Sequence, residues 1–195
     1  MSDKLILSHG TSAAHLDAIR KFGLLPRQEK PSLWDKCPSD SRCVYLTNAY
    51  AFYFAQNACH DAGEDALIVE VEVNRGRLDA DEDFLGQSSK GTEWETDFPD
   101  LIERTLYMRE AITKMPNPSR LALMENGLAN LGTVRHNGLI KPEKIKRMAR
   151  IPNADITRIV LSEFDPTITI MNYRFMGERY REFQQSLFDR YPLEV

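Results

Sequence analysis

The sequence predicts a single α+β domain, and three features of its 195 residues support that prediction. Short apolar strands are interrupted by helical segments at unequal spacing, unlike the regular alternation of a doubly wound sheet. The predicted strands also outnumber the crossovers that a parallel sheet needs. A chain of this length buries roughly two thirds of its unfolded surface, which is enough for one core without disulfides.

The first predicted strand runs through LILS and stops at the HGT sequence of residues 9–11, where a helix begins at once. Ser12 or Thr11 is a suitable N-cap for this helix, which we expect over about residues 13–22. Gly23 follows at the position where helices often end in a glycine. A strand that ends by presenting His-Gly-Thr is unusual enough to need an explanation.

The middle of the chain has a clear strand pattern. After the first helix we expect a surface loop over residues 26–42, a strand over 42–48, a helix over 49–63 and a strand over 66–74. In this last strand three valines alternate with Glu70 and Glu72, the period of a half-buried strand. The two glutamates are therefore expected on a solvated face of the sheet.

The second half of the chain is less regular. We expect an acidic, turn-rich excursion over residues 77–100, a helix over 101–115, a helix or loop over 118–132, a strand over 132–140, a turn or 3₁₀ segment over 142–148 and a last strand over 157–166. Residues 166–195 then form an amphipathic helical segment that packs back on the same domain. No internal repeat or linker divides the chain, so residues 1–195 are expected to form one domain.

Composition and motifs exclude several classes of function. The net charge of −4 gives no general attraction to nucleic acid, and no apolar run approaches the ~20 residues of a membrane span. The first residues show no signal-peptide pattern, so a cytoplasmic protein is expected. Three cysteines, Cys37, Cys43 and Cys59, lack CxxC spacing, so we expect no metal site and no disulfide framework. Neither GxGxxG nor GxxxxGK[ST] nor GxSxG occurs.

Several motifs occur in a characteristic order: HGT after the first strand, Gly23-Leu24 after the first helix, VYLT before an alanine- and aromatic-rich helix, ALIVEVEVN, and GLIKPEKI. In this order and spacing they resemble the ADP-ribosyltransferase fold, on the side of poly(ADP-ribose) polymerases and tRNA 2′-phosphotransferases and of their bacterial and phage relatives. The resemblance covers about residues 5–162. It implies a split, mixed or antiparallel β-sheet core with peripheral helices.

The resemblance also implies that NAD⁺ is the co-substrate, and it assigns roles to residues. His9 would hydrogen-bond the ribose and the Gly10 backbone the nicotinamide carboxamide, while Tyr45 and Tyr53 would lie on the two faces of the ring. Thr11 and Thr47 would help to hold the ribose or carboxamide, and Arg27 and Arg42 border the long loop where the pyrophosphate could bind. The alternatives are core packing for the tyrosines, helix capping for the threonines and solvation for the arginines.

The sequence departs from the family pattern at the third catalytic position. Polymerase-type members carry a glutamate at the start of the late strand, where this chain has Thr133. A threonine hydroxyl cannot act as a base near neutral pH, so chain elongation is not expected. Glu125, eight residues earlier, is the nearest carboxylate that could fill this role, and its alternative is an exposed helix residue.

The expected activity is therefore single-unit transfer: a mono-ADP-ribosyltransferase cleaves the nicotinamide–ribose bond of NAD⁺ and modifies a macromolecule, as toxin, phage or defence enzymes do. Two alternatives stay open. One is an NAD-dependent RNA 2′-phosphotransferase-like enzyme, which needs arginines to hold a phosphate. The other is an inactive module that binds ADP-ribose-like or protein ligands.

The sequence leaves the acceptor open between nucleic acid and protein. Residues 135–150 contain six basic residues against one acid, Glu143: Arg135, Lys141, Lys144, Lys146, Arg147 and Arg150. Arginines and aromatic residues also alternate near residues 173–181. Together they could hold RNA or DNA by phosphate contacts and stacking. A solvated basic face is the alternative, and a protein acceptor is equally compatible with the acidic composition.

Overall fold

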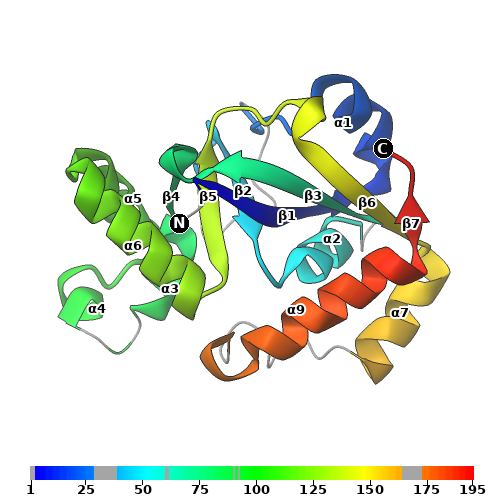
Figure 1. The fold of residues 1–195 in the computed structure, drawn as a ribbon. Helices are drawn as coiled ribbons and strands as arrows, with labels where there is room; N and C mark the ends of the chain where they lie inside the picture. The colour runs from blue at the N-terminus through cyan, green and yellow to red at the C-terminus, as the bar shows by residue number, and fades with distance from the viewer. Residues whose placement is uncertain (1–2, 29–38, 60–61, 90, 92, 164–172) are drawn as a thin grey trace.

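In the computed structural model, which describes residues 3–28, 39–59, 62–89, 91, 93–163 and 173–195, the chain is an α+β domain built on one seven-stranded sheet (Figure 1). The strand order is β4-β5-β2-β1-β3-β6-β7, and every neighbouring pair is antiparallel. In these residues no helix has the length and apolar character needed to cross a membrane.

The strands are β1 Lys4–Ser12, β2 Cys43–Thr47, β3 Ala66–Asn74, β4 Leu78–Ala80, β5 Thr133–Asn137, β6 Ile145–Ile151 and β7 Pro192–Leu193. The α-helices are α1 Leu16–Phe22, α2 Ala51–Cys59, α3 Glu82–Ser88, α4 Glu93–Asp97, α5 Leu101–Lys114, α6 Asn117–Asn130, α7 Asn153–Ser162 and α9 Tyr173–Arg190. Three 3₁₀ turns, η1 Ala13–His15, η2 Arg75–Arg77 and η3 Pro142–Lys144, lie between them.

Two apolar clusters cover the two faces of the sheet. Along β3, Ile68 belongs to one cluster, whereas Leu67 and Val69 belong to the other, because successive side chains of a strand point to opposite faces. Helices α2, α7 and α9 cover the Ile68 face, and α1 and part of α6 cover the other (Figure 1). Helices α3 to α6 lie beside β4 and β5, at the opposite end of the sheet from α7 (Figure 1).

The Gly23-Leu24 and GLIKPEKI motifs of the sequence are paired in the structure. Gly23, with φ of 78°, ends α1, and its Cα packs against the carbonyl of Ile140 so closely that a Cβ would lie 2.0 Å from that oxygen. Leu24 and Ile140 then exchange two backbone hydrogen bonds of 2.8 and 2.9 Å. This bridge fixes the segment after α1 against the segment after β5.

Three expected boundaries were wrong. The HGT sequence lies inside β1, because the strand continues to Ser12, whose hydroxyl accepts the Ala14 N–H and so caps η1. Residues 145–151 form strand β6 and not a turn, because their backbone pairs with β3. Residues 157–162 belong to helix α7 and not to a strand, since Ile156 and Ile159 are buried at helical spacing.

The other predicted helices and strands are confirmed where the structure describes their residues. The segments predicted over 42–48, 49–63, 66–74, 101–115 and 132–140 are β2, α2, β3, α5 and β5. The acidic excursion contains β4, α3 and α4, and residues 118–132 fall in helix α6. Cys37, most of the loop over 26–42 and residues 166–172 lie outside the described residues.

Candidate functional site

The junction of β1 and β2 carries the HGT sequence. Within the described ranges these strands share a single residue pair, Ser8 with Thr47. By contrast, β1 pairs with β3 along its whole length, from Lys4 to Ser12. The sheet is therefore split on the β2 side of residues 9–12, which is where the sequence predicted a binding site.

The ladder with β3 determines where the Gly10 backbone points. Arg75 N–H donates to the Asp3 carbonyl and Ala13 N–H to the Asp65 carbonyl, at the two ends of a ladder with constant register. In an antiparallel ladder, residues alternate between those that bond one neighbour and those that face the other. The odd-numbered residues of β1 therefore bond β3, and Gly10 directs its N–H and C=O toward the split.

His9 occupies the edge of this split. Its Nδ1 lies 2.9 Å from the carbonyl of Tyr45, and a carbonyl can only accept, so Nδ1 carries the hydrogen and donates. In an unbroken antiparallel ladder, the next hydrogen-bonded pair after Ser8 and Thr47 would be Gly10 and Tyr45. Burial lowers the pKa of His9, so the ring is neutral near pH 7 and Nε2 is its acceptor.

Gly10 also has a packing role. A Cβ on this residue would lie 1.9 Å from the carbonyl oxygen of Ala51 and 2.7 Å from the backbone nitrogen of Ala55. The backbone of α2 thus packs directly on β1, on the sheet face that bears Ser8 and Ile68. The absence of a side chain at Gly10 is required by this helix, whether or not a ligand approaches the backbone.

The two tyrosines predicted to stack on nicotinamide differ in their surroundings. The hydroxyl of Tyr45 donates to Glu82 and accepts the N–H of Asp40, both at 2.6 Å. Burial, with the charge of Glu82 second, raises the pKa of Tyr45. Tyr53 is half-buried in α2 and packs edge-on against Phe54 at 5.5 Å between ring centroids. Tyr45 thus belongs to a polar cluster, and Tyr53 borders the apolar core.

The remaining residues predicted to bind NAD⁺ lie around the junction. Thr47 is buried; its hydroxyl donates to the Gly132 carbonyl and accepts the N–H of Ala49 and Tyr50 ahead of α2. This is the capping alternative. Thr11 is half-buried and follows His9 on the same face of β1. Arg27 Nη2 donates to the Ser39 carbonyl at 2.7 Å.

Among the described residues, no hydrogen bond or ion pair joins His9 to Thr133 or Glu125, the two candidates for the third catalytic position. Thr133 is 1% exposed and pairs with Thr47 across β5 and β2. The Glu125 side chain, about half exposed, forms an ion pair with Arg75 and lines a cavity of about 400 Å³ that Leu5 and Met124 also line. The two candidates therefore stay predictions.

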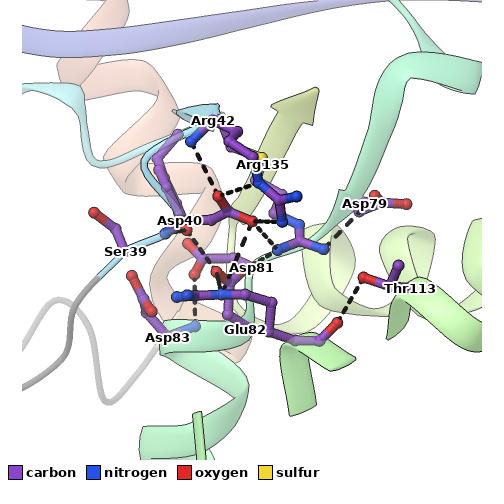
Figure 2. A network of polar contacts seen from close by, with 12 residues as sticks. Ser39, Asp40, Arg42, Asp79, Asp81, Glu82, Asp83, Thr113 and Arg135 are labelled. Carbon is purple, nitrogen blue, oxygen red and sulfur yellow. Dashed lines mark hydrogen bonds and ion pairs between the residues drawn. The ribbon is translucent and has the colours of Figure 1, made fainter. Parts of the chain in front are cut away.

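A buried cluster of charged residues next to Tyr45 was not predicted (Figure 2). Glu82, fully buried at the start of α3, lies 3.0 Å from Arg135 of β5 and 3.0 Å from Arg109 of α5. Asp40, before β2, and Asp79, in β4, flank Arg135 at 3.6 and 3.8 Å. We call Asp40, Asp79, Glu82, Arg109 and Arg135 the buried charge cluster.

The charges of this cluster shift the pKa of its neighbours. Burial alone would raise the pKa of Asp40, but the hydrogen bonds and charge of Arg42 lower it to about 2. Burial and the adjacent charge of Glu82 raise the pKa of Asp81, which precedes Glu82, to about 7. The sequence signal for this cluster is the DADED run of residues 79–83, but the local pattern of that run predicts only a turn-rich excursion.

The basic segment of residues 135–150 is largely paired with acids. Its ion pairs are Arg135 with Glu82, Lys141 with Glu143, Lys146 with Glu72, Arg147 with Glu70 and Arg150 with Asp65. Glu70 and Glu72 are thus half-buried ion-pair partners and not merely solvated, a correction to the sequence prediction. The side chains of residues 173–176 lie outside the described part. Nucleic-acid binding by this segment stays a prediction.

The sequence matches no protein-family model, and no curated protein matches it. The arrangement of the chain's own residues therefore carries the functional argument. Two parts of the molecule stand out in that arrangement: the split between β1 and β2, with His9 and Gly10, and the buried charge cluster on the far side of β2.

Proposed function

We propose that the chain is an NAD-dependent mono-ADP-ribosyltransferase that binds nicotinamide at the split between β1 and β2. One observation carries the proposal. Gly10 directs a backbone donor and a backbone acceptor toward the split. The Tyr45 carbonyl, which would bond Gly10 in an unbroken ladder, instead accepts a hydrogen bond from His9 Nδ1–H. The order of motifs, which resembles the ADP-ribosyltransferase fold, supports the same conclusion.

These groups fit the polar end of nicotinamide. A carboxamide has one oxygen that accepts and an NH₂ group that donates, so the Gly10 N–H and C=O can satisfy both. Neutral His9, held by Tyr45, would present Nε2 to a ribose hydroxyl. When bound, NAD⁺ supplies the ADP-ribosyl group and nicotinamide as the leaving group.

Positioning is the main contribution that these residues make to catalysis. A neutral His9 fixed on a strand holds its acceptor nitrogen in one place, and holding reactants in a productive geometry lowers the barrier by several kcal/mol in general. The late strand has Thr133 where polymerases have a glutamate, and its hydroxyl is buried. We therefore expect transfer of one unit to a macromolecule, protein or nucleic acid, and not chain elongation.

The test is release of nicotinamide from NAD⁺ by the purified chain. We expect His9→Ala to lower the release rate about tenfold to a hundredfold. The ribose gains positive charge as nicotinamide leaves, and a hydrogen bond to a charged group contributes ~1.5–3 kcal/mol. His15→Ala is the matched control, since His15 is exposed and precedes α1. Circular dichroism verifies that both variants fold. A folded His9→Ala protein with the wild-type rate would disprove the assignment, and labelled NAD⁺ identifies the acceptor.

A second candidate function is a module that binds ADP-ribose-like ligands without turnover. The ion pair of Glu125 with Arg75 favours it, because this carboxylate is already neutralised by a partner. The same assay separates the two functions. Binding of ADP-ribose by the wild-type chain without release of nicotinamide from NAD⁺ would support the module, and release would support the enzyme.

A further inference from the structure

A second cavity lies beside the buried charge cluster, on the side away from β1. It has a volume of about 430 Å³ and is formed between the segment before β2, the strands β4 and β5, and the helices α5 and α6. The charged residues that line it are Asp40, Arg42, Arg77, Asp79, Arg120 and Arg135. His9, Gly10 and Tyr53 are not among its lining residues, so this cavity is distinct from the β1–β2 split.

The two aspartates of the cavity are already engaged. Asp79 Oδ1 accepts Arg120 Nε and Nη2 at 2.9 and 2.6 Å, and its Oδ2 accepts the Asn137 amide at 2.8 Å. Asp40 accepts Arg42 through both oxygens. Four arginines against two aspartates therefore leave two positive charges without a matching carboxylate in the lining. The buried charge cluster behind the lining adds Glu82 and Arg109, one charge of each sign, so the excess of two positive charges remains. A cavity lined by an excess of one sign of charge attracts ligands of the opposite sign, so this excess favours an anionic ligand.

Two of the arginines have donors to offer. Arg77, exposed at the end of η2, forms no ion pair or hydrogen bond with any residue in the described ranges. Arg135 is 3% exposed, and its Nε has no hydrogen-bond partner in that part of the chain. Burial would lower the pKa of Arg135, but Glu82 and its other neighbours hold it above the ordinary value. Its guanidinium is thus a permanent cation at the cavity wall.

We propose that this cavity binds a phosphate monoester of nucleotide size. Such a group carries about −1.5 to −2 charges at pH 7, which matches the excess of two positive charges. Arginine forks match phosphate oxygens in pairs, and Arg42 and Arg77 stand at the exposed side of the cavity while Arg135 lies at its buried wall. The volume exceeds that of phosphate alone and lies in the range of small-molecule sites.

The experiment compares binding of adenosine 5′-monophosphate and of adenosine to the full chain by titration calorimetry. The two probes differ only in the phosphate, so we expect the nucleotide to bind and adenosine not to bind at the same concentrations. Arg77→Gln should raise the dissociation constant for the nucleotide about tenfold, by loss of a charge-assisted contact. Because Arg77 has no partner in the described chain, this variant should fold normally.

Two controls locate the binding. Arg179→Gln removes an exposed arginine from α9 and should leave the dissociation constant unchanged. His9→Ala should also leave it unchanged, which separates this cavity from the proposed nicotinamide site. The proposal is overturned if adenosine binds as tightly as the nucleotide, if Arg77→Gln binds like the wild type, if His9→Ala abolishes binding, or if no nucleotide binds at millimolar concentration.

Discussion

The two halves of the sheet are stabilised by different forces. Around β1, β3 and β6 both faces bury apolar residues, as Ile68 and Ala149 on one face and Val69 on the other illustrate, and all three are fully buried. Around β4, β5 and β2 one face instead buries charged groups, Glu82 and Arg135 among them, that balance one another. The first half depends on apolar area removed from water, whereas the second depends on each charge keeping its partner. The two halves should therefore respond very differently to single substitutions.

The largest effect is expected when one partner is removed from the charged half. Glu82→Ala leaves Arg135, Arg109 and the Tyr45 hydroxyl without their shared carboxylate. Breaking a buried pair in this way costs about 3–5 kcal/mol of unfolding free energy, because an uncompensated charge stays buried. Urea denaturation of the variant measures the loss.

Two further variants make this prediction specific. Glu110→Ala removes an exposed carboxylate that pairs with Lys114 on α5, and it should leave the unfolding free energy nearly unchanged. Glu82→Ala combined with Arg135→Ala should cost less than the two single changes added together, because the pair disappears as a unit. Additive losses would show that Glu82 and Arg135 are not coupled.

The apolar half could largely be predicted from the sequence. The valines of β3 alternate with Glu70 and Glu72, and this period is local, so the strand was assigned correctly. Strand β6 was not predicted because its pairing with β3 skips one residue: Glu70 pairs with Arg147, but Val71 pairs with Ile145. This irregularity interrupts the two-residue alternation by which a strand is recognised in a sequence. The charged residues of β6 also make it resemble a surface turn. Lys146 and Arg147 form ion pairs with the acids of β3, and no local sequence pattern predicts these pairs.

The candidate site could be predicted only in part for the same reason. His9 and Gly10 are adjacent in sequence, so a short motif could identify them. The buried charge cluster draws Asp40, Glu82, Arg109 and Arg135 from four distant segments, and only the fold brings them together. The sequence predicted that the Tyr45 ring stacks on nicotinamide, but it did not predict the hydrogen bond of the Tyr45 hydroxyl to Glu82 of this cluster.

The charged half should also make stability depend on pH, with the next largest effect at Asp81. Its folded pKa of about 7 lies above the ordinary 3.8, so its favourable contribution is complete below about pH 4 and is lost as the pH rises through 7. Asn has the same shape and also caps helices well. Asp81→Asn should therefore stabilise the fold at pH 7.5 by at most about 4 kcal/mol and by much less at pH 4.

Asp100 provides the matched control, because it caps α5 as Asp81 caps α3, accepting two backbone N–H groups at an exposed position. Asp100→Asn should not show this gain at pH 7.5. Unfolding free energies from urea titrations at both pH values test the pair. If the difference between wild type and Asp81→Asn is the same at pH 4 and pH 7.5, the buried carboxyl does not titrate between them.

The smallest effect is expected in the apolar half at Gly10, where β1 borders the proposed nicotinamide site. Gly10→Ala would place a methyl group 1.9 Å from the Ala51 carbonyl, so α2 must move away from β1. Overpacking of this kind costs about 1–3 kcal/mol. Gly76→Ala is the control, because a Cβ there would meet open space, and its unfolding free energy should stay within about 0.5 kcal/mol of wild type. If Gly10→Ala is as stable as Gly76→Ala, α2 does not pack on β1 as described. If Gly10→Ala folds but releases no nicotinamide, the proposed activity requires the Gly10 backbone in its present position against α2, and the loss does not come from unfolding.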